Sequence, residues 1–130
     1  MFLLDTDTCI RFMKGNPDVV RHFRKHGPSK LFLSSISHHE LLYGALHSAA
    51  IERHLKAVEH FTAPITILPF TAISATHSAV VRQQLAASGQ SIGPLDTLIA
   101  GHALEHELIL VTGNTREFSR VEGLKVETWG

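Results

Sequence analysis

Three carboxylate residues stand at points where an apolar segment of the chain passes into a predicted helix. Asp5 occurs in FLLDTDTC, Glu40 in SSISHHELLYG and Asp96 in IGPLDTLIAGHAL. In an open α/β sheet, such positions gather in the crevice beyond the carboxyl ends of the strands. Acids brought together there stay ionised at neutral pH only beside a cation, and Mg²⁺ or Mn²⁺ prefers oxygen ligands of this kind. The sequence therefore predicts a metal-dependent enzyme whose metal-binding, catalytic residues are these three acids.

Five further polar residues are candidates for the same edge of the sheet. Asp7 follows the first acid closely, and paired acids straight after a buried strand are a common way to build a metal or phosphoryl site. Asn114 follows the apolar run LILVT, so its amide oxygen is expected near the site. Thr112 either donates a hydrogen bond into the site or simply ends that strand. Arg116 and Arg120 come just after the strand, where they could contact a phosphate of the substrate.

Each acid, taken alone, also has an ordinary structural explanation. Aspartate and glutamate are favoured in the first turn of helices, where they cap amide groups and offset the helix dipole. Ser37 and Glu40 have the S-x-x-E spacing of a capping box, Asp96 closely follows a proline, and Gly113-Asn114 is a common turn sequence. Capping and metal binding are compatible, because all three acids could cap helices at one edge of one sheet.

The other residues capable of chemistry favour structural roles. A basic cluster is expected to be the solvated face of a helix, although it could also track a phosphate backbone. His102 and Cys9 lie on apolar stripes and are expected to pack in the core. The pair His38-His39 could bind metal or phosphate, but no second histidine or cysteine pair is expected to have the spacing of a zinc site. The basic cluster comprises Arg21, His22, Arg24, Lys25, His26 and Lys30.

Composition and charge narrow the class of protein. A length of 130 residues with 44% hydrophobic side chains predicts one domain, residues 1–130, with a single core. Lys plus Arg equals Asp plus Glu at 12 each, so the chain lacks the basic charge that is typical of nucleic-acid binders. The single cysteine permits no internal disulfide, which fits a reducing, cytoplasmic location. The start MFLLD does not resemble a signal peptide, and no apolar run approaches membrane-spanning length, so no membrane partner is expected.

Short apolar runs alternate along the chain with segments of helical periodicity. Strands are expected at residues 2–4, 31–36, 66–70, 108–112 and 124–128. Helices are expected at 6–13, 17–26, from 37 onward, at about 51–61, 73–85 and from 94 to about 103. The fourth strand is almost entirely apolar, which predicts a central position. The alternation predicts an α/β fold with a central, mostly parallel, twisted sheet of about four to five strands flanked by helices.

Four segments of the chain together resemble a known family. LLDTDTCI, ISSISHHELLYGA, IGPLDTLIAGHAL and LVTGNTREFSRVEGLKVETW, in this order, are similar to the PIN-domain ribonuclease toxins of the VapC type. The resemblance covers essentially the whole chain and implies a PIN fold. Asp5, Glu40 and Asp96 match the three acidic positions of the family, and Glu40 would bind the metal directly or through water. Asn114 matches a fourth position, which is Asp in many PIN nucleases.

The resemblance also implies an activity and partners. It implies an Mg²⁺- or Mn²⁺-dependent endoribonuclease that hydrolyses RNA with a metal-activated water and leaves 5′-phosphate and 3′-hydroxyl ends. The expected substrate is a tRNA anticodon loop, with initiator tRNA favoured. A cognate VapB-type antitoxin is expected to neutralise the toxin, and operator DNA is expected to be contacted only through that antitoxin. A homodimer, and a larger hetero-oligomer with the antitoxin, are expected from the family.

Two positions depart from the family pattern. Asp7 stands where Asn is common, which adds a negative charge close to the site. Gly101 stands where Ala is common, which is expected to ease helix packing. Neither change removes a required ligand, but Asn at 114 leaves a second metal position with one charge fewer.

Two other readings of the sequence remain. The segment DTDT at 5–8 matches the D-x-D-x-T signature of haloacid-dehalogenase-like phosphatases, with Asp5 as nucleophile and Asp7 as acid or base. That fold also requires a lysine and an adjacent acidic pair after Thr112, and the remaining chain has no such acidic pair. The second alternative is a non-catalytic module that keeps the PIN fold and only binds a partner.

Overall fold

Five parallel strands form the central sheet of the computed structural model, which describes residues 1–130. The strands are β1 (Phe2–Leu4), β2 (Leu31–Ser34), β3 (Thr66–Leu68), β4 (Ile109–Val111) and β5 (Val126–Glu127). Their order in the sheet is β3-β2-β1-β4-β5, and each neighbouring pair is parallel. The predicted α/β fold is confirmed. The fourth strand is interior as expected, but the central strand is β1.

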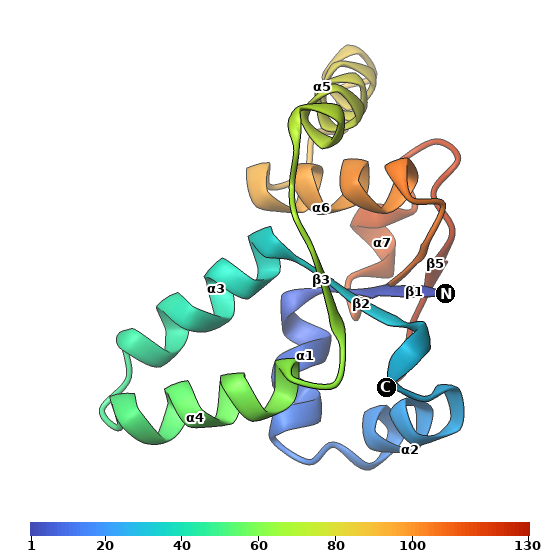
Figure 1. The fold of residues 1–130 in the computed structure, drawn as a ribbon. Helices are drawn as coiled ribbons and strands as arrows, with labels where there is room; N and C mark the ends of the chain where they lie inside the picture. Colours follow the sequence, from blue (N-terminus) through green and yellow to red (C-terminus); the bar gives the residue numbers. More distant parts are fainter.

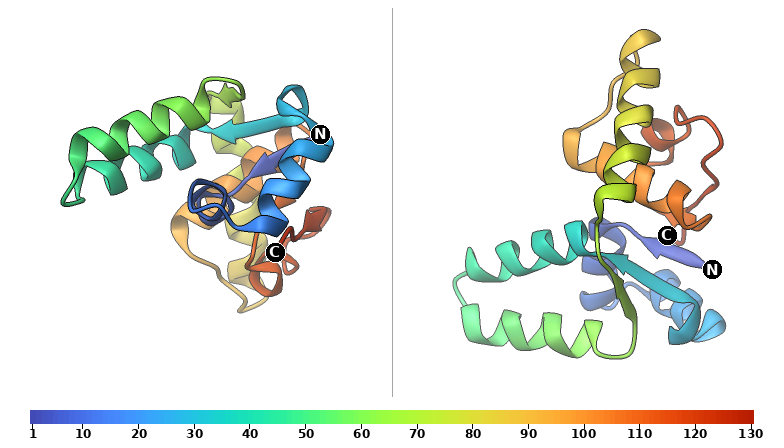
Figure 2. Two further views of the ribbon diagram at one scale, coloured as in Figure 1. Left: turned by 90° about the horizontal axis from the view of Figure 1, so that it is seen from below. Right: turned by 45° about the horizontal axis from the view of Figure 1, so that its top comes forward.

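Helices cover both faces of the sheet (Figure 1). One face carries α1 (Thr6–Met13), α2 (Pro17–His26), α3 (Ser35–Leu46) and α4 (Ile51–Thr62), with the short 3-10 turn η1 (Pro28–Lys30) before β2. The other face carries α5 (Ala72–Ala87), α6 (Pro94–Glu105) and α7 (Thr115–Phe118). Figure 2 shows that α3 and α4 run side by side as a hairpin that extends away from the sheet. No helix has both the length and the apolar character needed to cross a membrane.

Alternate residues of β1 point into two hydrophobic cores. Phe2 and Leu4 pack in the core beneath helices α1 to α4, which also contains Trp129. Leu3 packs in the other core, beneath α5 to α7, which is called the second core below. Because β1 is covered on both faces, its sequence is a continuous apolar run rather than an alternating one.

The strand order creates a topological switch between β1 and β4. From β1 the chain proceeds to β2 and β3 on one side, and later to β4 and β5 on the other side. Ligands of open parallel sheets bind beyond the carboxyl ends of the strands at such a point. Asp5 directly follows β1 and Asn114 comes shortly after β4, so the switch explains why these two distant residues lie together.

Local sequence signals set the starts of several helices. The carboxylate of Asp5 caps α1 by accepting the Thr8 N–H at 2.8 Å. Asn16 caps α2 with its side chain, and Pro17 follows in the first turn. Pro94 occupies the first turn of α6. These boundaries agree with the prediction because each signal acts within a few residues of the chain.

The start of α3 differs from the prediction. Ser34 is its N-cap, and the Ser34 hydroxyl accepts the Ile36 N–H at 3.1 Å. The predicted capping box of Ser37 and Glu40 is therefore wrong, because Ser37 lies buried inside the helix and its hydroxyl has no hydrogen-bond partner. β2 ends at Ser34 rather than at 36, and Ile36 uses its apolar side chain as a helix residue packed against the second core.

Two more boundaries differ from the prediction. β3 ends at Leu68 rather than at 70, and the next residue, Pro69, has no N–H with which to extend a strand ladder. The chain after β4 forms α7, which no pattern in the sequence predicted. Phe118 of α7 is buried in the second core, so tertiary packing stabilises a helix too short to form alone.

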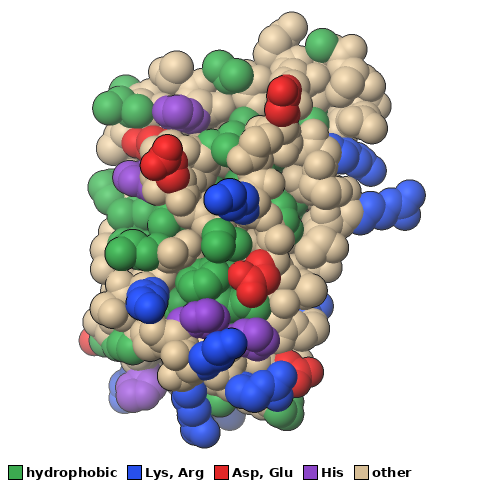
Figure 3. Space-filling model, turned by 90° about the vertical axis from the view of Figure 1, so that its right-hand side faces the viewer, with side chains coloured by type: hydrophobic (Ala, Val, Ile, Leu, Met, Phe, Trp, Pro, Cys, Tyr) green, Lys and Arg blue, Asp and Glu red, His purple; other side chains and the backbone are tan.

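The basic cluster of residues 21–30 lies on the outer side of α2 and the following turn. Figure 3 shows Lys, Arg and His side chains gathered at the lower end of the face at the amino ends of the strands. Arg21, Arg24, Lys25 and Lys30 are exposed, and Arg21 pairs with Asp18 at 2.9 Å. The solvated face is confirmed for these four residues, whereas His22 and His26 are half-buried and stack on Trp129.

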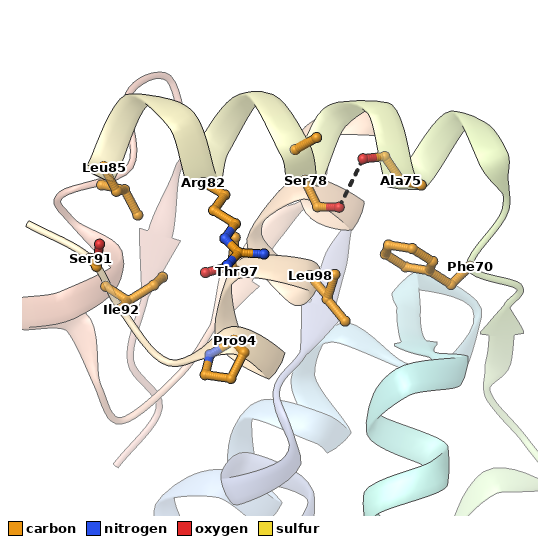
Figure 4. A pocket seen from close by; sticks show the side chains of 11 residues that line it. Phe70, Ala75, Ser78, Arg82, Leu85, Ser91, Ile92, Pro94, Thr97 and Leu98 are labelled. Carbon is orange, nitrogen blue, oxygen red and sulfur yellow. Dashed lines mark hydrogen bonds between the residues drawn. The ribbon is translucent and has the colours of Figure 1, made fainter. Parts of the chain in front are cut away.

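Helices α5 and α6 approach each other very closely at Gly101. A Cβ built on Gly101 would lie 2.4 Å from the Cα of Ser78, so no larger residue fits without movement of the backbone. A cavity of about 660 Å³ lies beside this contact, and Figure 4 shows Arg82 reaching from α5 across it toward α6. The predicted role of Gly101 in helix packing is confirmed.

Candidate active site

A cavity of about 470 Å³ lies at the carboxyl edge of the sheet. Asp5 after β1, Glu40 on α3 and Asp96 on α6 all line it, so the structure brings the three predicted acids to one place. The predicted supporting residues Asp7 and Asn114 line the same cavity. The other lining residues are Thr6, Ile10, Arg11, Ile99, Gly113 and Phe118.

Asp5 is the most buried of these acids and is 9% exposed. Its main-chain N–H donates to the Val111 carbonyl at 3.0 Å, which joins the end of β1 to β4. Burial raises the pKa of Asp5, while hydrogen bonds from Thr112 and Thr8 to its carboxylate oppose that rise. The nearby charge of Asp7 raises the pKa further.

Glu40 is positioned by α1 as well as by its own helix. It lies within α3, and its Oε1 accepts a hydrogen bond from the Thr6 hydroxyl at 2.8 Å. Thr6 is the first residue of α1 and directly follows Asp5. This bond therefore links the second acid to the strand end that carries the first.

Asp96 lies in the first turn of α6. Burial raises its pKa, and the charges of Glu117, Asp5 and Glu40 raise it further. These electrostatic interactions require Glu117, Asp5 and Glu40 each to lie near Asp96, although the four residues come from four separate segments of the chain. A cluster of this kind is unfavourable when fully ionised and attracts a cation.

The donors around the cavity fit a divalent cation that prefers oxygen ligands. Arg11 is the one cationic side chain in the lining. Its Nε lies 3.2 Å from Oδ2 of Asp7, and its guanidinium also donates to the main-chain oxygen of Gly130. No histidine or cysteine lines the cavity. Carboxylate and amide oxygens suit Mg²⁺ or Mn²⁺, whereas imidazole and thiolate ligands favour zinc.

Not every predicted supporting residue reaches the cavity. Thr112 is buried and does not line the cavity. It supports two residues that do, because its hydroxyl accepts the Asn114 N–H at 2.9 Å and a second hydrogen bond joins its side chain to Asp5. Arg116 and Arg120 lie outside the lining, and Arg120 donates to the Ser91 carbonyl at 3.4 Å. Their contact with RNA phosphates stays a prediction.

Two residues that lie near the acids were not predicted from the sequence as part of the site. Arg11 lies four positions after Asp7 on α1, a spacing that was the available signal for their ion pair, but only the fold shows that its side chain also reaches Gly130. Glu117 is the charged neighbour with the largest effect on Asp96, but it belongs to α7, a helix that was not predicted. The segment TREF directly after Asn114 was the available signal for Glu117.

The histidines and the cysteine outside the cavity behave mostly as expected. Cys9 and His102 are fully buried, as predicted. His38 and His39 do not line the cavity. The prediction that no second histidine pair has zinc-site spacing is wrong, because His102 of α6 and His106, the C-cap of that helix, are four positions apart, a spacing that zinc ligands use on helices.

Comparison with known proteins decides the family. The sequence profile of the PIN domain matches residues 2–124. The chain belongs to the PIN-domain family. This chain is 44% identical over 128 residues to the tRNA(fMet)-specific endonuclease VapC of Shigella flexneri, and the match covers 98% of this chain and 97% of the relative. This membership argues against a haloacid-dehalogenase-like phosphatase.

Solved structures agree with this assignment. This chain superposes on a chain of the DNA-bound VapBC crystal structure from Salmonella typhimurium with a TM-score of 0.94 and 41% sequence identity. The superposition covers 99% of this chain and 98% of that chain. This chain also superposes on a chain of the promoter-bound VapBC2 structure from Rickettsia felis with a TM-score of 0.93 and 29% identity, covering 99% and 98%. The predicted PIN fold is confirmed over the whole chain.

Proposed function

We propose that this chain is the toxin of a VapBC-type toxin–antitoxin system, a metal-dependent endoribonuclease that cuts initiator tRNA. The observation that carries the proposal is the convergence of Asp5, Glu40 and Asp96 on one cavity at the switch point of the sheet. The Shigella flexneri relative is named as a tRNA(fMet)-specific endonuclease, and the similarity extends over almost the full length of both chains.

Asp5 and Asp96 hold Mg²⁺, or Mn²⁺ in its place, and Glu40 binds the ion directly or through water. When bound, the ion supplies the positive charge that lowers the pKa of a water and offsets charge on the reacting phosphate. The Thr6 hydroxyl orients the carboxylate of Glu40. The hydrogen bonds from Thr8 and Thr112 fix the carboxylate of Asp5, so the ligands are positioned before the ion arrives.

The remaining lining residues shape the approach of RNA. Asp7 pairs with the Arg11 guanidinium, and this ion pair offsets part of the charge of the one cation in the lining. Asn114 contributes an uncharged amide to the cavity lining. Arg116 is exposed on α7 and is available to an RNA phosphate, whereas Arg120 would first have to leave Ser91.

The substrate is recognised by shape rather than by bulk charge. The formal net charge is zero, so long-range attraction to RNA is weak. Single-stranded loops expose bases that a protein can read individually, and an anticodon loop is such a target. The products carry 5′-phosphate and 3′-hydroxyl ends.

The partner is a VapB-type antitoxin encoded with this chain. The two superposed structures are VapBC complexes bound to DNA. We infer that this chain pairs with its antitoxin in the same way, forms a homodimer within that assembly, and contacts operator DNA only through the antitoxin.

Cleavage of total tRNA tests the proposal. The antitoxin-free protein would be incubated with total tRNA in Mg²⁺, in Mn²⁺ and in EDTA, beside an Asp96→Asn variant, and the cut ends mapped. The proposal expects metal-dependent cuts in the anticodon loop of initiator tRNA that are absent from the variant. Cleavage that persists in EDTA or in Asp96→Asn would contradict the assigned site, and cuts confined to other RNAs would contradict the assigned substrate.

A further inference from the structure

A second group of metal-ligand side chains lies on α6, outside the cavity that contains the three acids. His102, Glu105 and His106 each offer one ligand atom, and these three atoms all lie within 4.8 Å of one another. His102 and Glu105 lie in the last turn of α6 and His106 is its C-cap, so their i, i+3, i+4 spacing brings them together at the end of the helix. At ~1.5 Å per residue, His102 lies about 9 Å along the helix axis from Asp96. The group is therefore separate from the nuclease site.

The buried imidazole of His102 satisfies only one of its two nitrogens. The side chain is fully buried, and Nδ1 forms a hydrogen bond with the Ser34 hydroxyl at 2.8 Å. Nε2 has no hydrogen-bond partner and faces Oε1 of Glu105 at 4.0 Å. The structure leaves the tautomer open, and the main chain of Pro69 also lies near the ring. With the proton on Nδ1, the lone pair of Nε2 faces a carboxylate oxygen; with the proton on Nε2, its N–H lies too far from Oε1 of Glu105 to donate a hydrogen bond. In both tautomers a cation between Nε2 and the carboxylate would give Nε2 the partner that it lacks.

The spacing of the three ligand atoms is close to that of a zinc site. Oε1 of Glu105 lies 3.6 Å from Nε2 of His106 and 4.0 Å from Nε2 of His102. Two bonds of ~2.1 Å to a tetrahedral ion separate the ligand atoms by about 3.4 Å. The Glu105–His106 pair is already near that separation, whereas the histidine nitrogens, which lie within 4.8 Å of each other, must move inward. The side chain of His106 is 37% exposed and is free to make that movement.

Two hydroxyl groups from other elements orient the ligands. Ser34, at the junction of β2 and α3, fixes the Nδ1 side of His102. Ser74, in the first turn of α5, donates a hydrogen bond to Oε1 of Glu105. The ring of Phe70 packs edge-on against His102 at a centroid distance of 5.4 Å and shields that ring. Outer hydrogen bonds of this kind fix the tautomer and direction of metal-binding histidines.

We propose that His102, Glu105 and His106 form a second cation site, which prefers Zn²⁺ and other imidazole-binding transition metals to Mg²⁺. Two imidazoles, one carboxylate and one position open to water make up a three-ligand zinc site. An ion held there connects the last turns of α6 to the start of α5 through Ser74 and to the start of α3 through Ser34. Its role is to stabilise the packing of these elements, independently of RNA cleavage.

Zinc binding by calorimetry tests the proposal. All proteins would carry Asp96→Asn, which disables the first site, and any affinity tag would be removed because histidine tags bind zinc. The background protein would be compared with His106→Gln and Glu105→Gln, and with the control His60→Gln, an exposed histidine on α4. Circular dichroism would confirm that each protein is folded.

The proposal expects one tight Zn²⁺ per chain in the background and in the His60→Gln control. His106→Gln and Glu105→Gln should each weaken binding by roughly tenfold or more, as loss of a ligand does. Excess Mg²⁺ should not displace the zinc, and zinc should raise the melting temperature of the control but not of His106→Gln. Equal affinity in His106→Gln and the background, or no Zn²⁺ binding to the folded background, would overturn the proposal.

Discussion

At the residue scale, the acids of the cavity are both helix-start residues and candidate metal ligands. Asp5 caps α1 through Thr8, and it also lines the cavity beside Asp96 and Glu40. The capping explanation for Glu40 fails, because Thr6 of a different helix engages its carboxylate. Glu40 thus has no structural role in starting its own helix, which favours a functional one.

Replacing Asp96 by Asn should stabilise the metal-free protein at neutral pH. The folded-state pKa of Asp96 is raised by burial and by Glu117, so the folded protein binds a proton more tightly than the unfolded chain does. Stability is therefore lost as pH rises from 3.8 through the folded pKa, and at pH 7 the buried charge is fully unfavourable. In EDTA at pH 7, Asp96→Asn should melt at a higher temperature than the wild type, and this difference should shrink as pH falls toward 4.

An exposed acid provides the matched control for that experiment. Glu52→Gln removes an exposed acid outside the cavity, from the first turn of α4, where it offsets the helix dipole, so it should lower the melting temperature slightly rather than raise it. Excess Mg²⁺ should raise the melting temperature of the wild type and of Glu52→Gln more than that of Asp96→Asn. A wild type that melts above Asp96→Asn in EDTA at pH 7 would contradict the crowding of the acids.

Replacing Thr6 by Val should slow cleavage without unfolding the protein. Valine has nearly the same shape as threonine but cannot donate the hydrogen bond to Glu40, so the carboxylate loses its orientation. Loss of such an outer hydrogen bond typically lowers metal affinity or activity by roughly 10- to 100-fold. Cleavage rates measured across a series of Mg²⁺ concentrations should show this loss, and Thr6→Ser should restore most of it. Unchanged rates and Mg²⁺ dependence in Thr6→Val would show that Thr6 does not position Glu40.

At the element scale, the junction of β2 and α3 is where local signals misled the prediction. The segment LFLSSIS contains serines at 34, 35 and 37, and each could cap a helix. Ile36 extended the apolar run, which favoured a longer strand and a later cap. Tertiary packing decided the boundary instead, because Ile36 lies within α3 and packs against the second core from there.

Serine-to-alanine substitutions at this junction should lower the free energy of unfolding by different amounts. Ser34→Ala removes the N-cap of α3 and the partner of His102, and should lower the free energy of unfolding by about 1–2 kcal/mol. Ser37→Ala removes a buried hydroxyl that has no partner, and should be close to neutral. Urea unfolding of the two variants checks this difference. A larger loss from Ser37→Ala would restore the capping-box interpretation.

Two helix glycines should respond to alanine in opposite directions. Gly101→Ala forces a Cβ against the backbone of Ser78 on α5 and should destabilise the fold by roughly 1–3 kcal/mol. Gly44→Ala on α3 meets nothing within 4 Å and should stabilise the fold by about 0.5–1 kcal/mol. Thermal unfolding distinguishes these outcomes. A stable Gly101→Ala variant would mean that α5 and α6 separate more easily than the structure indicates.

At the scale of the whole molecule, the number and type of the main elements could be predicted from the sequence. The apolar runs at 2–4 and 108–112 indicated buried strands, and Pro17, Pro94 and the glycines after helices marked boundaries. Strand order could not be derived this way, because periodicity shows which face of a segment is buried but not which strand lies beside it. The central place of β1 depends on pairing with both β2 and β4, which are far away in sequence.

The candidate site was predicted where its residues follow buried strands, and missed where they do not. Asp5 and Asn114 were found because each follows an apolar run, and Asp96 because it opens a helix. Glu117 and Arg11 do not follow a buried strand, although the i, i+4 spacing of Arg11 from Asp7 did mark their ion pair. They reach the acids only through the packing of α7 and the contact of α1 with the end of the chain.

The central claim is that Asp5, Glu40 and Asp96 form one metal site, and Mn²⁺ binding tests it most directly. Electron paramagnetic resonance would count bound Mn²⁺ in the antitoxin-free wild type, in Asp5→Asn, Glu40→Gln and Asp96→Asn, and in the control Glu52→Gln. One site made by three ligands predicts that each of the three variants loses Mn²⁺ affinity by roughly tenfold or more, while the control binds like the wild type. Variants that are folded and bind Mn²⁺ as tightly as the wild type would contradict the claim.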